Sequence, residues 1–187
     1  MDYTSQITAY FEREKKVIDA IDKNRLSEVM NVLEQARKEG RNIFIMGNGG
    51  SAATASHYVC DFNKGVSMNQ EQRYRFICLN DNVPTMMAYA NDVSYADVFV
   101  RPLQNLYRMG DVVIGISGSG NSENVVRAMQ WAKENSAVTI ALTGFDGGKI
   151  HHIAQYGVNV PIADMQITED LHMMLDHCMM KILSPDY

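Results

Sequence analysis

Two short segments rich in glycine and serine have the chemistry of a phosphate-binding site. The first, GNGGS at residues 47–51, follows a short apolar run, and the second, at 115–122, contains Ser117, Ser119 and Ser122. Glycine lets the backbone approach a ligand closely, and the free N–H groups at a helix N-terminus favour anions. Serine hydroxyls and backbone amides can surround a phosphate without Lys or Arg. Either segment alone could be a tight turn with a helix cap, but two in one chain favour an anion site.

The first segment also matches part of a dinucleotide-binding fingerprint. Gly47, Gly49 and Ala52 have the spacing G-x-G-x-x-A after an apolar run. That fingerprint expects an acidic residue about 20 positions further on, at the end of the next strand. Asp81 lies well beyond that distance, and the fingerprint leaves the serine segment unexplained. A phosphate site is therefore the stronger interpretation.

Ionisable side chains on two predicted helices could bind a metal or move protons. His57 and Asp61 are four residues apart, so they share one face of the helix that follows the glycine segment. Near the C-terminus, an otherwise apolar helix carries Glu169, Asp170, His172, Asp176 and His177. At about 100° per residue, His172 and His177 point to different sides of that helix and cannot easily serve one site.

A histidine from each helix, with carboxylates, is a suitable ligand set for zinc or a related divalent ion. The alternative is that His57 and His177 are partly buried, hydrogen-bonded imidazoles, and that Asp170 and Asp176 lie on a solvated helix face. Helical geometry itself does not prefer His177 to Asp176 as a ligand. The adjacent histidines at 151–152 are predicted to be a surface pair near a helix end.

Short strands that alternate with helices predict the architecture that positions these groups. Strands are expected at 42–46, 75–79, 111–115, 138–142 and 157–160, and helices at 51–63, 83–89, 125–134 and 166–183, after two helices within 3–38. This alternation predicts an α/β fold with three αβα layers around a parallel sheet. The chain is expected to be a single domain, 1–187, with an N-terminal helical segment at 1–40 and an α/β core at 41–187. Ligands of such sheets bind at the carboxyl ends of the strands.

Composition excludes several other classes of protein. The 187 residues include 17 Lys and Arg against 22 Asp and Glu, a net charge of −5, so no electrostatic argument favours nucleic-acid binding. The three cysteines show no CxxC spacing, which argues against a disulfide framework and fits a reducing cytoplasm. We find no signal-peptide pattern and no apolar run long enough to span a membrane.

Taken together, the motifs resemble those of the phosphoheptose isomerase group of sugar isomerase (SIS) domains. The matching stretches are GNGGSA at 47–52, His57, Asn91-Asp92, the serine segment at 115–122, LTG at 142–144, DGGK at 146–149, and Glu169, His172 and His177. The resemblance implies a flavodoxin-like sheet and a homotetramer with sites at subunit interfaces. It also implies interconversion of sedoheptulose 7-phosphate and D-glycero-D-manno-heptose 7-phosphate.

The resemblance further implies roles for individual residues. The residues that would hold the phosphate are Ser117, Gly118, Ser119 and Ser122. The residues that would contact the rest of the substrate are Asn48, Gly49, Gly50, Ser51, Asn91 and Asp92. The residues that would bind zinc are His57, Asp61, Glu169 and His177. This sequence has Asp61 where the isomerases usually have Glu, and Glu169 where they usually have Gln. Gln166 or Thr168 could also fill the position of Glu169.

The resulting hypothesis is an aldose–ketose isomerase that works through an enediol or enediolate. Asp61 or Glu169 would remove the proton next to the carbonyl, His177 would act as the acid and base, and a divalent metal, expected to be zinc, would assist. No redox cofactor is needed, because the reaction only relocates hydrogens. The alternatives are an isomerase for another ketose phosphate, or a non-catalytic adaptor or sensor that binds a phosphosugar or a partner protein.

Overall fold

The computed structural model describes residues 1–184, so the last residues of the predicted domain, 185–187, lie outside it. Its centre is a five-stranded sheet, parallel throughout, with the order β2-β1-β3-β4-β5. The strands are β1 (Ile43–Met46), β2 (Phe76–Cys78), β3 (Val112–Ser117), β4 (Val138–Thr143) and β5 (Tyr156–Asn159). This is the flavodoxin-like order, in which the direction of strand addition along the sheet reverses between β1 and β3. The predicted fold class is confirmed.

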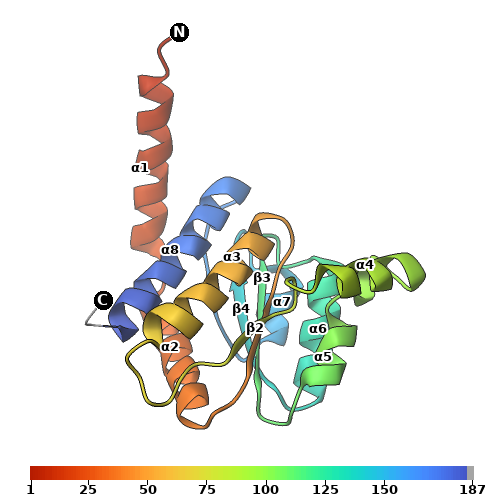
Figure 1. Cartoon of the computed structure of the whole chain (residues 1–187). Coiled ribbons are helices and arrows are strands. Elements are labelled where there is room, and N and C mark those ends of the chain that lie inside the picture. Colours follow the sequence, from red (N-terminus) through yellow and green to blue (C-terminus); the bar gives the residue numbers. More distant parts are fainter. Residues whose placement is uncertain (185–187) are drawn as a thin grey trace.

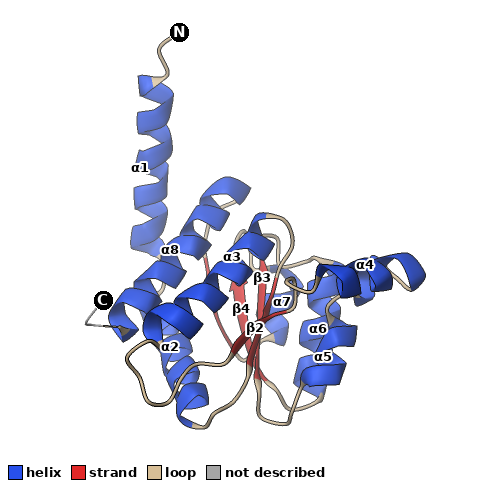
Figure 2. Ribbon diagram, in the orientation of Figure 1, coloured by secondary structure: helices blue, strands red, loops and turns tan. Residues whose placement is uncertain are grey.

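Helices cover both faces of the sheet (Figures 1 and 2). They are α1 (Thr4–Ala20), α2 (Lys23–Lys38), α3 (Gly50–Cys60), α4 (Val83–Asp92), α5 (Val100–Leu106), α6 (Glu123–Glu134), α7 (Gly148–Ile153) and α8 (Met165–Leu183). Side chains of β1 alternate between two apolar clusters: Ile43 and Ile45 join residues of α2, α3 and α8, whereas Phe44 and Met46 join residues of α5, α6 and α7. The alternation explains why the strand is apolar throughout, since both of its faces are buried.

The sequence did not predict α5 and α7. These helices have 7 and 6 residues, too few for an apolar period to repeat. The helix α7 also begins at Gly147 and Gly148, whose φ angles are +90° and +56°, and a glycine pair is typical of a turn. The predicted helix at 51–63 changes at Asp61 into a π-helical turn, Asp61–Val66, and β3 continues to Ser117, two residues beyond the predicted strand.

The first helix projects from the body of the molecule (Figure 1). Only Val17 of α1 is buried, and the side chains of Tyr3, Ile7 and Phe11 are more than half exposed. The turn to α2 falls at Asp22, whose side chain caps the new helix by accepting from the backbone N–H groups of Asn24 and Arg25. Across the described chain, no helix is both long and apolar enough to cross a membrane.

Candidate active site

The glycine and serine loops meet at the carboxyl edge of the sheet. Strands β1 and β3 are neighbours and run parallel, with Met46 opposite Gly115. The loops that follow these strands therefore leave the sheet side by side, at the point where the strand order reverses. Open α/β sheets bind their ligands at such a point.

A cavity of about 270 Å³ lies between these loops and the start of α8. It is lined by Asn48, Gly49, Ser51, Ile116, Ser117, Gly118, Ser119, Ser122, Met165 and Glu169. Most of the residues predicted to contact substrate are thus brought together around one space. A larger cavity of about 570 Å³ lies beside the edge strand β2 and is lined by none of the predicted site residues.

Gly50, the first residue of α3, makes room for the carboxylate of Glu169. A Cβ atom at Gly50 would lie 2.3 Å from Oε2 of Glu169, far inside van der Waals contact. Any larger residue at position 50 would therefore force this carboxylate to shift.

The serine hydroxyls of the second loop are gathered at the N-terminus of α6. The Oγ atoms of Ser117 and Ser122 are 3.2 Å apart, and Ser119 Oγ accepts from the backbone N–H of Asn121. Ser122 is the N-cap residue of α6, yet its side chain caps no backbone N–H group. All three serines line the cavity, at the positive end of the helix dipole.

Two residues that sequence reasoning missed tie the loops together. The side-chain amides of Asn48 and Asn124 exchange two hydrogen bonds, each 2.9 Å, and the Tyr95 hydroxyl donates to Asn48 Oδ1 at 2.9 Å. Asn124 follows the serine loop directly, so its position was a usable signal. Tyr95 lies in the short 3-10 helix Tyr95–Asp97 after α4, and nothing local to its sequence indicates the contact.

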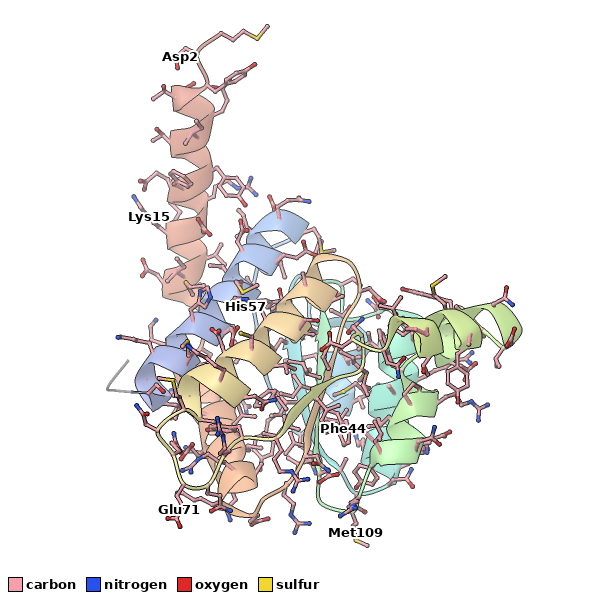
Figure 3. The ribbon with its side chains drawn as sticks, in the orientation of Figure 1. Asp2, Lys15, Phe44, His57, Glu71 and Met109 are labelled. Atoms are coloured by element: carbon pink, nitrogen blue, oxygen red, sulfur yellow. The ribbon has the colours of Figure 1, made fainter. Side chains whose placement is uncertain are left out.

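A second cluster of functional groups lies between α3 and α8, where His57 is labelled in Figure 3. The donor group consists of His57, Asp61, Asp176 and His177, whose ligand atoms all lie within 4.8 Å of one another. The Nε2 atoms of His57 and His177 are 3.0 Å apart, and Asp61 Oδ2 lies 3.5 Å from the first and 3.9 Å from the second. Both imidazoles remain accessible, because their side chains are 41% and 55% exposed.

Asp176 is completely buried, so the expectation that it lies on a solvated helix face is wrong. Neither of its carboxylate oxygens has a hydrogen-bond partner among the residues described. Burial, together with the nearby carboxylate of Asp61, raises the pKa of Asp176 to about 8. It lies four residues after the buried His172, and this spacing places both on the face of α8 that packs inward.

The donor group fits a divalent cation. Two imidazole nitrogens and two carboxylates are a set that zinc and similar ions accept. The two buried oxygens of Asp176 have no other partner in the described part of the chain, and a bound cation would supply one.

Comparisons with known proteins assign the family. The profile of the SIS domain family matches residues 2–144. A phosphoheptose isomerase from Aquifex aeolicus is 35% identical over 159 residues, which cover 85% of this chain and 83% of that protein. The chain belongs to the phosphoheptose isomerase group of the SIS domain family. A phosphoheptose isomerase from Aliarcobacter butzleri is 33% identical over 178 residues, covering 95% and 93% of the two chains.

The SIS fold is shared with solved structures over nearly the whole chain. The structure of a phosphoheptose isomerase from Neisseria gonorrhoeae superposes with a TM-score of 0.89 at 28% identity. The match covers 98% of this chain and 100% of that one. It therefore extends beyond the SIS domain profile and includes α8, which carries Glu169 and His177.

The remaining predicted residues of this SIS domain lie apart from the donor group. Glu169 lines the cavity and is not a member of the group among the residues described. Asn91 and Asp92, at the end of α4, are exposed, bond to each other and do not line the cavity.

The other histidines of the chain also lie elsewhere. His172 is buried and its Nε2 donates to the carbonyl of Thr143 at 3.1 Å, whereas its Nδ1 has no partner in the described structure. Burial lowers the pKa of His172 to about 4. The histidines at 151–152 are exposed on α7, as the surface-pair interpretation expected.

Proposed function

We propose that this SIS-domain protein interconverts sedoheptulose 7-phosphate and D-glycero-D-manno-heptose 7-phosphate through an enediol. One observation carries the proposal: a hydroxyl-lined cavity that contains one carboxylate, Glu169, lies along the same two helices as a donor group with two histidines. The related phosphoheptose isomerases support the choice of reaction and substrate.

The serine loop would hold the phosphate. Ser117, Ser119 and Ser122 would donate hydroxyl hydrogen bonds, and Gly118 would supply its backbone N–H. Asn48, Gly49, Gly50 and Ser51 would line the sugar. Because the phosphate is remote from the reacting carbons, its binding energy can orient C1 and C2 without taking part in the chemistry.

Glu169 is the better of the two predicted bases, since it lines the cavity and Asp61 belongs to the donor group. It would take a proton from C1 of the ketose, and the C1–H electron pair would form the C1–C2 double bond of the enediol. The same proton, or one from water, would return to C2. His177 would move the proton between O2 and O1, so that the reaction is balanced without an oxidant or a reductant.

His57, Asp61 and His177 would hold a divalent metal, which we take to be zinc. The ion would neutralise the negative charge that develops on the two substrate oxygens.

Assembly would complete the site. A homotetramer with sites at subunit interfaces explains why Ile7 and Phe11 of the projecting α1 are 51% and 54% exposed, and why Asn91 and Asp92 lie away from the cavity of their own chain. Light scattering of the purified protein should give four times the chain mass of 21.0 kDa.

We further propose that residues 1–187 act as one domain in the cytoplasm. The free thiols of Cys60, Cys78 and Cys178 suit such a reducing compartment.

The substrate is tested by incubating the purified protein with a panel of ketose phosphates and with sedoheptulose itself. We expect the corresponding aldose from sedoheptulose 7-phosphate, and far less product from the sugar without phosphate. Turnover of another ketose phosphate alone would overturn the substrate but keep the reaction class. No turnover of any member would overturn the isomerase assignment.

A further inference from the structure

We propose that Asp176, rather than Glu169, is the fourth ligand of the metal site formed by His57, Asp61 and His177. Glu169 is then free to act on the substrate alone. The inference rests on the proposed function only in taking the donor group to be a metal site.

The geometry of the donor group selects Asp176. It is the second carboxylate among the four residues whose ligand atoms lie within 4.8 Å of one another. Consecutive residues on a helix point about 100° apart, so Asp176 and His177 can approach one ion from different directions. His57 and Asp61 complete the set from α3 and from the π-helical turn that follows it.

The surroundings of Asp176 require a positive partner. Its carboxylate is fully buried, and both oxygens are without a hydrogen-bond partner in the described chain. Asp61 adds a second negative charge nearby, and the buried Tyr58 hydroxyl beside it is also unpartnered. A buried, unpaired carboxylate is strongly destabilising, and a second carboxylate increases the repulsion. A cation between the two carboxylates removes both penalties.

Glu169 is placed for a different task. Its carboxylate lies over Gly50 and lines the cavity between the loops. It comes seven residues before Asp176, which is roughly 10 Å along the axis of α8. The two carboxylates therefore lie at different levels of α8, Glu169 in the cavity wall and Asp176 beside the two histidines.

Metal titration separates the two residues without any substrate. Zinc affinity would be measured by competition with a chromophoric chelator for the wild type, Asp176→Asn, Glu169→Gln and Asp170→Asn, the last being a matched change on the same helix outside the donor group. Loss of a direct ligand should exceed the 10–100-fold loss typical of indirect contacts, so we expect Asp176→Asn to weaken zinc binding by more than about 100-fold. The other two variants should stay within a few-fold of the wild type.

A cysteine at the same position gives a spectroscopic test. With Co²⁺ in place of zinc, Asp176→Cys should show the near-ultraviolet charge-transfer band of a cobalt thiolate, and Glu169→Cys and the wild type should not. Thermal unfolding in a chelator checks the fold: Asp176→Asn should be about as stable as the wild type there, because a neutral amide replaces a buried acid that has no partner in the described structure, and should gain less stability from zinc.

Three results would overturn the inference: unchanged zinc affinity in Asp176→Asn, a large loss in Glu169→Gln, or a wild type that binds neither zinc nor cobalt. Failure of the proposed function would appear differently, as a zinc-loaded wild type that converts no ketose phosphate.

Discussion

The cavity at the edge of the sheet and the donor group between α3 and α8 lie along the same two helices, but different features position them. The cavity is formed mostly by loop backbone at the reversal between β1 and β3, so the strand order fixes it. The donor group depends on how two helices pack and on which side chains are buried there. A binding site built from backbone is therefore easier to predict than a ligand set built from packed side chains.

The largest expected effect comes from Gly50→Ala, a change that should impair the cavity and leave the donor group intact. The new Cβ would overlap the Glu169 carboxylate, and a displacement of about 1 Å can cost about 100-fold in rate. We expect kcat/KM to fall by about that factor while zinc affinity stays unchanged. Gly65→Ala is the matched control, because its Cβ would meet the flexible end of Met180 at 2.5 Å, away from the cavity. Full activity in Gly50→Ala would contradict the role given to Glu169.

The buried face of α8 gives the next effect, on stability. In the unfolded state His172 has its ordinary pKa of 6.5, whereas in the folded state its pKa is about 4. Between these two pH values the unfolded state therefore binds more protons than the folded state. The contribution of His172 to stability should therefore fall as the pH falls through this range, by about 2 kcal/mol between pH 7.5 and pH 5.

Urea unfolding of His172→Gln at the two pH values checks this, because Gln can still donate to Thr143 but does not titrate. An unchanged pH dependence in the variant would mean that His172 is not the group responsible.

Removing one hydroxyl from the cavity should have a smaller effect. Ser119→Ala loses a hydrogen bond to a charged group, worth about 1.5 kcal/mol at the low end, or roughly tenfold in kcat/KM. Measured with sedoheptulose and its 7-phosphate, the loss should be confined to the phosphorylated sugar. An equal loss of kcat/KM with both sugars would show that the phosphate does not bind at this loop.

The smallest effect is expected where the two loops are joined. Tyr95→Phe removes the hydroxyl that donates to Asn48, a bond worth about 1 kcal/mol, so kcat/KM should fall only a few-fold. Zinc affinity should not change. A loss as large as that of Gly50→Ala would show that loop position, rather than the Glu169 carboxylate, limits catalysis.

The same contrast explains how much the sequence could predict. The five strands and the position of the two loops follow from apolar runs and glycines, which are local signals. The helices α5 and α7 are too short to show a period. The burial of Asp176 depends on the packing of α8 against α3, which periodicity indicates only in part, and the contact between Tyr95 and Asn48 joins segments with no shared signal. Glu169 could be placed in the cavity only once the start of α8 was known relative to Gly50.

Isotope exchange during turnover tests the central claim most directly. Zinc-loaded wild type and Glu169→Gln would each be given sedoheptulose 7-phosphate in D2O, and deuterium at C2 of the aldose product would be followed by NMR. The account predicts aldose from the wild type, with deuterium at C2 to the extent that the transferred proton exchanges with water, and a rate lower by about 100-fold or more in the variant, at equal zinc content. Equal rates in the two proteins, or no product from the wild type, would contradict it.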